Sequence, residues 1–423
     1  MNETMACPQQ RTSRDRIAVP PLAELPALLS AAPHRLMFFA GTTAILTSML
    51  WWAAVLCGAR FGFPHVPTAP VPPGWAHAIL TQYGMLPLFV FGFLLTVFPR
   101  WMNQPALTRR HYVPVFAGVF GGYLLSHVGL FGLHGVLIAG LALMLAGWLG
   151  AMAALGRVLL AHGGGDRHAL SCYAALAFGA CGIAAFIAFA LGAAWQFAFV
   201  AIKLGTFALL LPIYFTVCHR MIPFFSANVA PGYRVVRPAW SLPVLWSLAL
   251  AHLGLELTHR YDLLWLVDFP LAVFFAWHAL AWQPWKARRP GLLFALHLAF
   301  AWLPIAFALF GAQSLIQFLD GGFVLGRAPV HALTVGFFGS MLVAMVTRVT
   351  QGHSGRPLEM GRVAWITFGA LQVVALLRVG AELAQDHALW FAVAALAWVV
   401  AFLPWVLRAA WIYLTPRADG KPG

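Results

Sequence analysis

Runs of about twenty apolar residues recur along the whole chain, and short stretches with proline, glycine or arginine separate them. A helix of that length crosses the hydrocarbon core of a bilayer, which is about 30 Å thick. Only 9% of the residues are charged, whereas a soluble chain has about a quarter. We therefore predict an all-α polytopic membrane protein with about twelve transmembrane helices in a lipid bilayer. The expected helices are 35–57, 76–99, 111–133, 135–160, 169–191, 195–219, 239–257, 262–282, 291–312, 329–349, 362–383 and 387–414.

The two ends of the chain are expected to lie outside this membrane domain. Residues 1–33 are basic and then rich in proline, which predicts a flexible cytoplasmic arm. No apolar core with a small-residue cleavage site follows the basic stretch, so we expect no signal peptide. Residues 34–415 form the twelve-helix domain, and residues 416–423 are a short cytoplasmic tail.

The basic residues predict the orientation of the helices. With a cytoplasmic N-terminus, all but five of the 26 Lys and Arg residues fall on the cytoplasmic side, as the positive-inside rule expects. The five others are Arg60, Arg260, Arg327, Arg378 and Lys203, which lies inside the sixth helix. Cytoplasmic loops that face anionic lipid account for the net charge of +14, so the sequence gives no support for nucleic-acid binding.

Most of the chemistry is expected from the 16 histidines, because ionisable groups within a membrane are costly and usually functional. The five cysteines form no CxxC or CxxCH motif, which argues against covalent c-type haem and a zinc knuckle. The predicted topology sorts the histidines into an outer and an inner layer. The outer layer holds His77, His331 and the stripe His252, Glu256 and His259, and the inner layer holds His219, His297 and His353.

The tenth predicted helix contributes to both layers. His331 and His353 are 22 residues apart, roughly 33 Å along a helix, so they cannot bind the same metal. We expect His331 to pair with His77. His297, His353 and Arg348 should converge on the inner side near His219 or Arg220, with the loop "TQGHSGRPL" folding back. The alternative is a capped loop in which His353 only satisfies helix-end carbonyls.

A weak repeat links the second, sixth and tenth helices. Each ends near an arginine, and Arg100, Arg220 and Arg348 are 120 and 128 residues apart. Three pseudo-repeats of four helices explain this spacing, but so does the general preference for arginine at inner helix ends. Three such arcs would be similar to the catalytic subunit of haem–copper oxidases, although the paired histidine motifs of those enzymes are absent here.

Four segments carry a closer resemblance: "GFLLTVFPRWMNQPAL", "HRMIPFFSAN", "WQPWKARRPGLLFALHLAFAWLP" and "HALTVGFFGSMLVAMVTRVTQGHSGRPL". They resemble signature segments of the NnrS family, bacterial twelve-span membrane proteins that contain haem and copper and are linked to nitric oxide. The resemblance covers most of the chain and implies a place in the bacterial inner membrane. Carried over by position, it marks His77, His297, His331, Arg348, His353 and Arg356, with Arg220, Pro223 and Asn228 after the sixth helix.

The second helix departs from the family pattern, which is close to W-H-x-H-E. Here the segment reads "AHAIL", so His77 is kept while Ile79 and Leu80 replace the second histidine and the glutamate. This puts copper in doubt and leaves haem b as the expected cofactor. Candidate metal ligands are His77, His331, His297, His353 and His219, followed by the stripe of the seventh helix.

The residue chemistry suits haem independently of the resemblance. Neutral imidazoles from two facing helices can clamp a b-type haem, and 34 Phe and 18 Trp residues can wall it or simply pack against lipid. Arg348 and Arg356 either neutralise propionates or anchor the inner helix ends.

Three functions remain open at this stage. The first is a haem-containing protein of nitric oxide metabolism or nitrosative-stress resistance. It would bind, detoxify or reduce nitric oxide or iron–nitrosyl species, as an oxidoreductase of denitrification with an electron-donor partner. The second is a secondary transporter, in which Lys203, His219 and the helices broken by proline would provide the ion-coupling and substrate-binding groups. The third is a haem-binding sensor or assembly protein without turnover.

Overall fold

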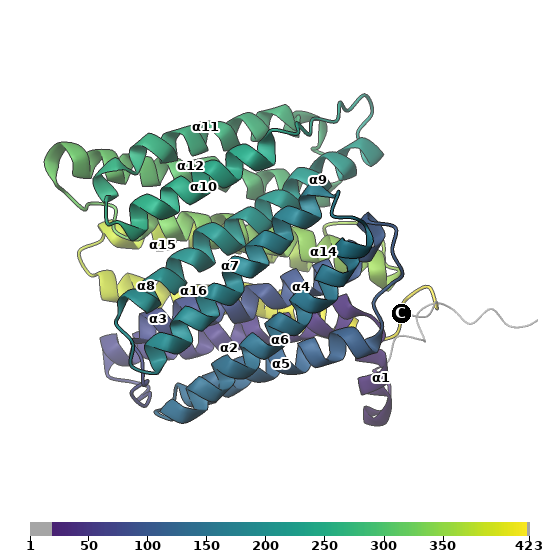
Figure 1. Cartoon of the computed structure of the whole chain (residues 1–423), viewed down its shortest axis with the longest axis horizontal. Helices are drawn as coiled ribbons and strands as arrows, with labels where there is room; N and C mark the ends of the chain where they lie inside the picture. The colour runs from purple at the N-terminus through teal and green to yellow at the C-terminus, as the bar shows by residue number, and fades with distance from the viewer. Residues whose placement is uncertain (1–18, 421–423) are drawn as a thin grey trace, which may run out of the picture.

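The computed structural model describes residues 19–420, and within that range the chain is helical without a strand (Figure 1). Twelve helical stretches follow one another, which confirms the all-α polytopic prediction. Eleven are long and apolar enough to cross a membrane, and the shorter apolar helix α10 has 17 residues. The stretches are α2 (Pro33–Phe61), α3–η2–α4 (Pro73–Trp101), α5 (Arg109–Gly129), α6 (His134–Ala161), α7 (Arg167–Ala190), α8–η3–α9 (Gln196–Val229), α10 (Ser241–Leu257), α11 (Trp265–Ala281), α12 (Gly291–Asp320), α13–η6–α14 (Ala328–Ser354), α15 (Arg362–Gly380) and α16 (His387–Tyr413).

Three helices run five or more residues beyond their predicted ends. The stretch expected to stop at residue 219 continues through Pro223 to Val229, and α12 continues to Asp320. Helix α14 continues to Ser354, where Gly355 ends it in the left-handed conformation with φ 69°. His353 therefore lies in the last helical turn, and the predicted fold-back of a loop that carries it is wrong. Helix ends outside the apolar run have no hydropathy signal, which explains these differences.

The predicted arm at residues 1–33 lies mostly outside the described residues. Its described part forms the short helices η1 (Leu22–Glu24) and α1 (Leu25–Leu29). Arg109 at the start of α5 donates hydrogen bonds to the backbone carbonyls of Ser30 and Ala27. This segment is therefore held against the membrane domain.

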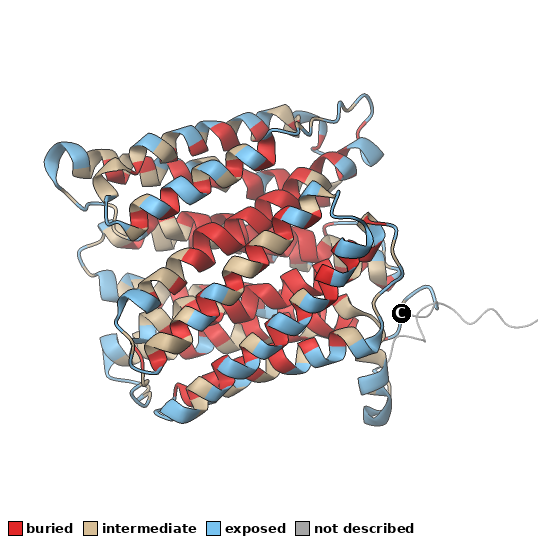
Figure 2. Ribbon diagram, viewed as in Figure 1, coloured by how far each residue is buried: buried red, intermediate tan, exposed pale blue. Residues whose placement is uncertain are grey.

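The second, sixth and tenth stretches form the centre of the molecule (Figure 2). Their most apolar windows are 72–89% buried, against 33–56% for the other eight long helices. Each of the three contains a π-helical segment near its middle, namely Leu80–Met85, Leu204–Leu210 and Ala332–Gly339. The segments begin 124 and 128 residues apart, which matches the spacing of the arginines and supports three units of four helices. π-helical turns are rare and frequently mark functional sites.

The π-helical segments contact one another directly. The amide of Gln82 in η2 donates a 2.8 Å hydrogen bond to the Thr206 hydroxyl in η3. Gly205 leaves room for this contact, because a Cβ there would lie 2.2 Å from Oε1 of Gln82. The irregular turns are thus packed inside protein, where neighbouring groups can satisfy their backbone.

Helices α5 and α6 pack through glycines at backbone distance. A Cβ at Gly122 would lie 2.4 Å from the Met144 nitrogen, and one at Gly118 would lie 2.5 Å from Cα of Gly147. Small residues at such crossings let membrane helices approach closely enough for extensive van der Waals contact.

Both described ends of the chain meet at one face of the helix bundle. Arg35 at the start of α2 is buried and donates hydrogen bonds to the carbonyls of Tyr413 and Thr415. We call this side the terminal face and the opposite side the distal face. Helices α2 and α16 therefore lie side by side, so the first and the last of the twelve helical stretches meet (Figure 1).

Candidate functional site

His77 and His331 lie near one another at the distal face, on α3 and α13. Both are half-buried, and they are close enough for their charges to interact. The His77 ring stacks on Trp52 with centroids 4.7 Å apart and an interplanar angle of 8°, and its buried Nδ1 has no hydrogen-bond partner. Nδ1 of His331 lies 2.9 Å from the Arg327 carbonyl and donates to it. This bond leaves Nε2 of His331 as the nitrogen with a free lone pair, the arrangement of a metal-ligating histidine.

Arg378 on α15 adds positive charge beside this pair. Its charge interacts with both His77 and His331, and its guanidinium forms a 2.7 Å ion pair with Glu382. It also lies 4.2 Å above the ring of Phe391. The distal pair therefore sits next to a fixed guanidinium whose charge is balanced by Glu382.

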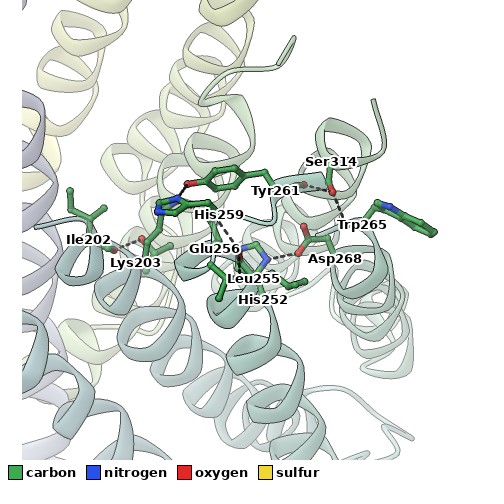
Figure 3. A network of polar contacts seen from close by, with 12 residues as sticks. Ile202, Lys203, His252, Leu255, Glu256, His259, Tyr261, Trp265, Asp268 and Ser314 are labelled. Atoms are coloured by element: carbon green, nitrogen blue, oxygen red, sulfur yellow. Dashed lines mark hydrogen bonds and ion pairs between the residues drawn. The ribbon is translucent and has the colours of Figure 1, made fainter. Parts of the chain in front are cut away.

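A chain of four ionisable side chains lies in the distal half between η3, α10 and α11 (Figure 3). Lys203 Nζ is 2.8 Å from Glu256 Oε2, and Glu256 Oε1 is 3.6 Å from His252 Nε2. His252 Nδ1 is 2.6 Å from Asp268 Oδ1. We call these four residues the polar chain.

The polar chain becomes more buried from one end to the other. The side chains are 23% exposed at Lys203, 4% at Glu256 and 0% at His252 and Asp268. Aromatic rings of Phe207 and Phe310 surround the imidazole of His252. Glu256 and Asp268 lie beside the two ring nitrogens of His252, so the polar chain is an ionic network. It includes only His252 and Glu256 of the three residues predicted as a stripe on the seventh helix.

His259, the third member of that predicted stripe, lies apart from the polar chain. It is exposed, its backbone has φ 57°, and its Nδ1 bonds the hydroxyl of Tyr261 at 2.9 Å. No contact joins His252, Glu256 or His259 to His77 within residues 19–420.

At the terminal face His353 packs against a histidine that the sequence prediction did not include. Its ring centroid is 4.0 Å from that of His34, in the first turn of α2. Arg348 lies one turn away with its guanidinium 3.8 Å above the ring of Phe225. His34 also lies 3.5 Å from the Thr96 hydroxyl.

His219 belongs to a second terminal-face group, on α7 and α9. Its Nδ1 is 3.0 Å from Nε2 of His168, and its own Nε2 is buried without a partner. Arg220 forms a 2.6 Å ion pair with Asp166 and lies 4.2 Å above Trp101. Burial alone would raise the pKa of Asp166, but the N–H of Ala169 and the Arg220 guanidinium hold it below its usual value.

Two other predicted residues have unsatisfied polar atoms. His297 on α12 is buried, and its Nε2 has no hydrogen-bond partner. Arg356 is half-buried with its guanidinium 5.1 Å above Trp411, and both of its terminal nitrogens lack a partner. In the described part of the chain no hydrogen bond, ion pair or ring contact links His297, His353, Arg348 and His219 into one cluster.

An apolar cavity of about 60 Å³ lies between the central helices and α2. It is walled by aromatic, methionine and aliphatic side chains, and Val349 and Phe38 place its terminal end one turn from His353 and His34. The lining residues are Phe38, Phe89, Val90, Phe93, Leu94, Ile213, Tyr214, Val217, Cys218, Met341, Leu342, Met345, Val346 and Val349.

Haem and copper make different demands on these residues. No group of three or more His, Cys, Asp or Glu residues that could hold a metal ion occurs within residues 19–420. A haem iron needs only one or two protein ligands. The free Nε2 of His331 and the unpartnered buried Nδ1 of His77 on a different helix fit that demand.

Several residues of these groups, among them His168 and Asp166, were not predicted from the sequence. Asp268 stands alone in the apolar run "WLVDFPLAVFF", and a lone carboxylate there signals a buried partner. His34 lies at the depth of His353, one residue before the predicted helix start. Arg378, within the predicted helix 362–383, was counted only among the basic residues away from the cytoplasmic side and was not placed beside His77 and His331.

Comparison of the sequence with known proteins and protein families identifies the family of this chain. No curated protein matches the chain. A family model with the description "NnrS protein" matches residues 28–417. This match spans all twelve helical stretches and includes His77, His331 and the four signature segments. The chain therefore belongs to the NnrS family.

Proposed function

We propose that this protein binds haem b between His77 and His331 and acts on nitric oxide in the membrane. The observation that supports it best is the hydrogen bond from Nδ1 of His331 to the Arg327 carbonyl, which orients Nε2 as a ligand. Membership of the NnrS family supports a haem- or metal-containing membrane protein linked to nitric oxide at family level.

The residues around the pair have distinct roles in this proposal. Trp52, stacked on His77, fixes the plane of that imidazole. Arg378 and Arg327 supply positive charge for the carboxylates of the macrocycle. A bound iron would supply a redox-active centre, and a diatomic ligand would bind to it by replacing His77 or His331. Oxidoreductase activity would then require an electron-donor partner.

His353 and His34, with Arg348 and Arg356, form the second candidate cofactor region, at the terminal face. The two tilted rings lie one turn from the apolar cavity, and Arg356 has free donors for an anionic group. Because the ring centroids are only 4.0 Å apart, an iron does not fit between them in this arrangement. We place the principal site at His77 and His331 for that reason.

The terminal face is proposed to be cytoplasmic, in a bacterial inner membrane. Arg35, Arg100, Arg220 and Arg348 lie near the terminal ends of α2, α4, α9 and α14. Basic residues at one side of the helices favour the cytoplasmic side.

A secondary transporter is the alternative that one observation favours. Three central helices are interrupted by π-helical turns, and Lys203 stands next to one of them inside the membrane domain. Interrupted helices with buried charges form substrate sites in many transporters.

Haem content and the visible spectrum separate these functions. The protein purified in detergent should show a Soret band, and His77→Ala or His331→Ala should lower haem per protein by more than half. His162→Ala, in an exposed loop, is the matched control. A coloured protein should also change its spectrum on addition of nitric oxide. A colourless but folded wild-type protein, or unchanged haem in both variants, would overturn the proposed site.

A further inference from the structure

We propose that the polar chain Lys203–Glu256–His252–Asp268 is a proton-transfer relay that loads a buried site at Asp268 from the distal face. Its ligand is a proton, and the inference does not depend on haem. Ionisable groups within a membrane domain mark proton relays and ion pathways by default.

The four side chains lie in sequence along the proposed proton path. Successive polar atoms are 2.8, 3.6 and 2.6 Å apart. His252 and Asp268 share a hydrogen bond and Lys203 and Glu256 form an ion pair, whereas Nε2 of His252 has no hydrogen-bond partner, so Glu256 must move closer to it before a proton passes. The chain begins at the partly exposed Lys203, beside the exposed His259 region at the end of α10. It ends at Asp268, whose Oδ2 is buried and has no partner.

The charges explain why the site would hold one proton. Lys203 and Glu256 cancel one another, so the net charge depends on the proton shared by His252 and Asp268. With that proton the chain is neutral, and without it the chain carries one negative charge among aromatic rings. Burial penalises a net charge, and the unloaded chain therefore draws a proton from the distal side.

Each transfer conserves atoms and charge. Lys203 passes a proton to Glu256, Glu256 passes one to Nε2 of His252, and Nδ1 of His252 passes one to Oδ1 of Asp268. Lys203 then regains a proton from water at the distal face. The sum is one proton removed from water and one bound between His252 and Asp268.

Few other groups near the polar chain can titrate. Lys203 comes from the end of α8, and η3 presents Phe207. Helix α12 presents Phe307 and Phe310 to His252. Tyr261, between α10 and α11, is close enough for its charge to interact with Glu256. Proton binding in this region can therefore be assigned to the four residues of the polar chain.

Infrared difference spectroscopy on the full-length protein in nanodiscs tests the relay. After a pH jump the wild type should show the carbonyl stretch of a protonated carboxylic acid, which shifts in D2O. Asp268→Asn should remove this band. Glu256→Gln should slow its appearance at least tenfold. Asp320→Asn, an exposed carboxyl at the distal end of α12, is the matched control and should leave the band unchanged.

Two results would overturn the relay: a band that persists in Asp268→Asn, or a Glu256→Gln variant with wild-type kinetics. If Asp268→Asn does not fold, Asp268→Glu replaces it and should keep the band at an altered frequency. An unaltered frequency in that variant would also count against the proposal. Loss of haem from the His77 or His331 variants would not affect this outcome, so the two proposals fail separately.

Discussion

The ion pair between Lys203 and Glu256 should be strongly coupled, and a double-mutant cycle measures that coupling. At a separation of 2.8 Å and an effective dielectric constant of about 20, their attraction is ~6 kcal/mol before the cost of desolvation. Removal of one partner of a buried pair leaves the other charge unpaired and costs about 3–5 kcal/mol. Lys203→Met and Glu256→Gln should each lie in that range.

The double variant should be much more stable than the sum of the single variants predicts. It removes both charges, so no unpaired ion remains in the apolar surroundings, and we expect a coupling energy of about 3 kcal/mol or more. Equilibrium unfolding in mixed micelles, followed by tryptophan fluorescence, provides the four free energies of unfolding.

An exposed ion pair in the same region provides the control for this cycle. Arg260 and Asp262 are 54% and 36% exposed, and solvent screens their interaction, so their cycle should show no measurable coupling. If the effects of Lys203→Met and Glu256→Gln on the free energy of unfolding were additive, the two charges would not stabilise one another, and this prediction would be wrong.

Three further predictions concern packing and the terminal face. Gly122→Ala should lower the free energy of unfolding by about 1–3 kcal/mol, because α5 and α6 must separate, whereas Gly135→Ala has open space and should be neutral or stabilising. Thermal unfolding of both variants checks this, and equal melting temperatures would contradict it. The pKa of Asp166 is lowered in the folded state, so its stabilisation is present above the ordinary value of about 4 and is lost as the pH falls below it. The difference in melting temperature between wild type and Asp166→Asn should therefore shrink on acidification from pH 7, and a constant difference would exclude the effect. Arg35→Ala should expose the segment after α16 to proteolysis, because it removes the hydrogen bonds to the Tyr413 and Thr415 carbonyls. Unchanged cleavage rates would show that other contacts hold this segment.

The sequence allowed the helices to be predicted well, because each membrane helix needs a long apolar run. The depth of His77 and His331 followed from the same runs. The apolar runs did not predict which side chains pair with one another, because the rotation of each helix about its own axis depends on tertiary packing. The π-helical turns add to this limit: each inserts an extra residue into a helix and changes which side chains share a face, and no residue type marks such a turn.

Contacts between distant helices were equally hidden. His353 was predicted to meet His297, but its nearest aromatic partner is His34, more than 300 residues earlier in the chain. The contact of α2 with α14 depends on how the helices pack in three dimensions, which a hydropathy pattern does not encode. Asp268 and Lys203 each had a local signal, but only the packing of α11 and η3 against α10 shows that both belong with Glu256.

The shortness of α10 has a consequence for the bilayer itself. Its 17 residues span roughly 25 Å, about 5 Å less than a typical hydrocarbon core. Lipids beside a short helix are compressed or its ends draw headgroups inward, at a modest cost per ångström. Glu256 is the penultimate residue of α10. Local thinning of the bilayer would therefore bring headgroup water closer to this side chain, although apolar helices surround the polar chain. The thickness of the surrounding membrane would then set how readily Glu256 becomes hydrated, and acyl-chain length becomes a physical variable for this protein.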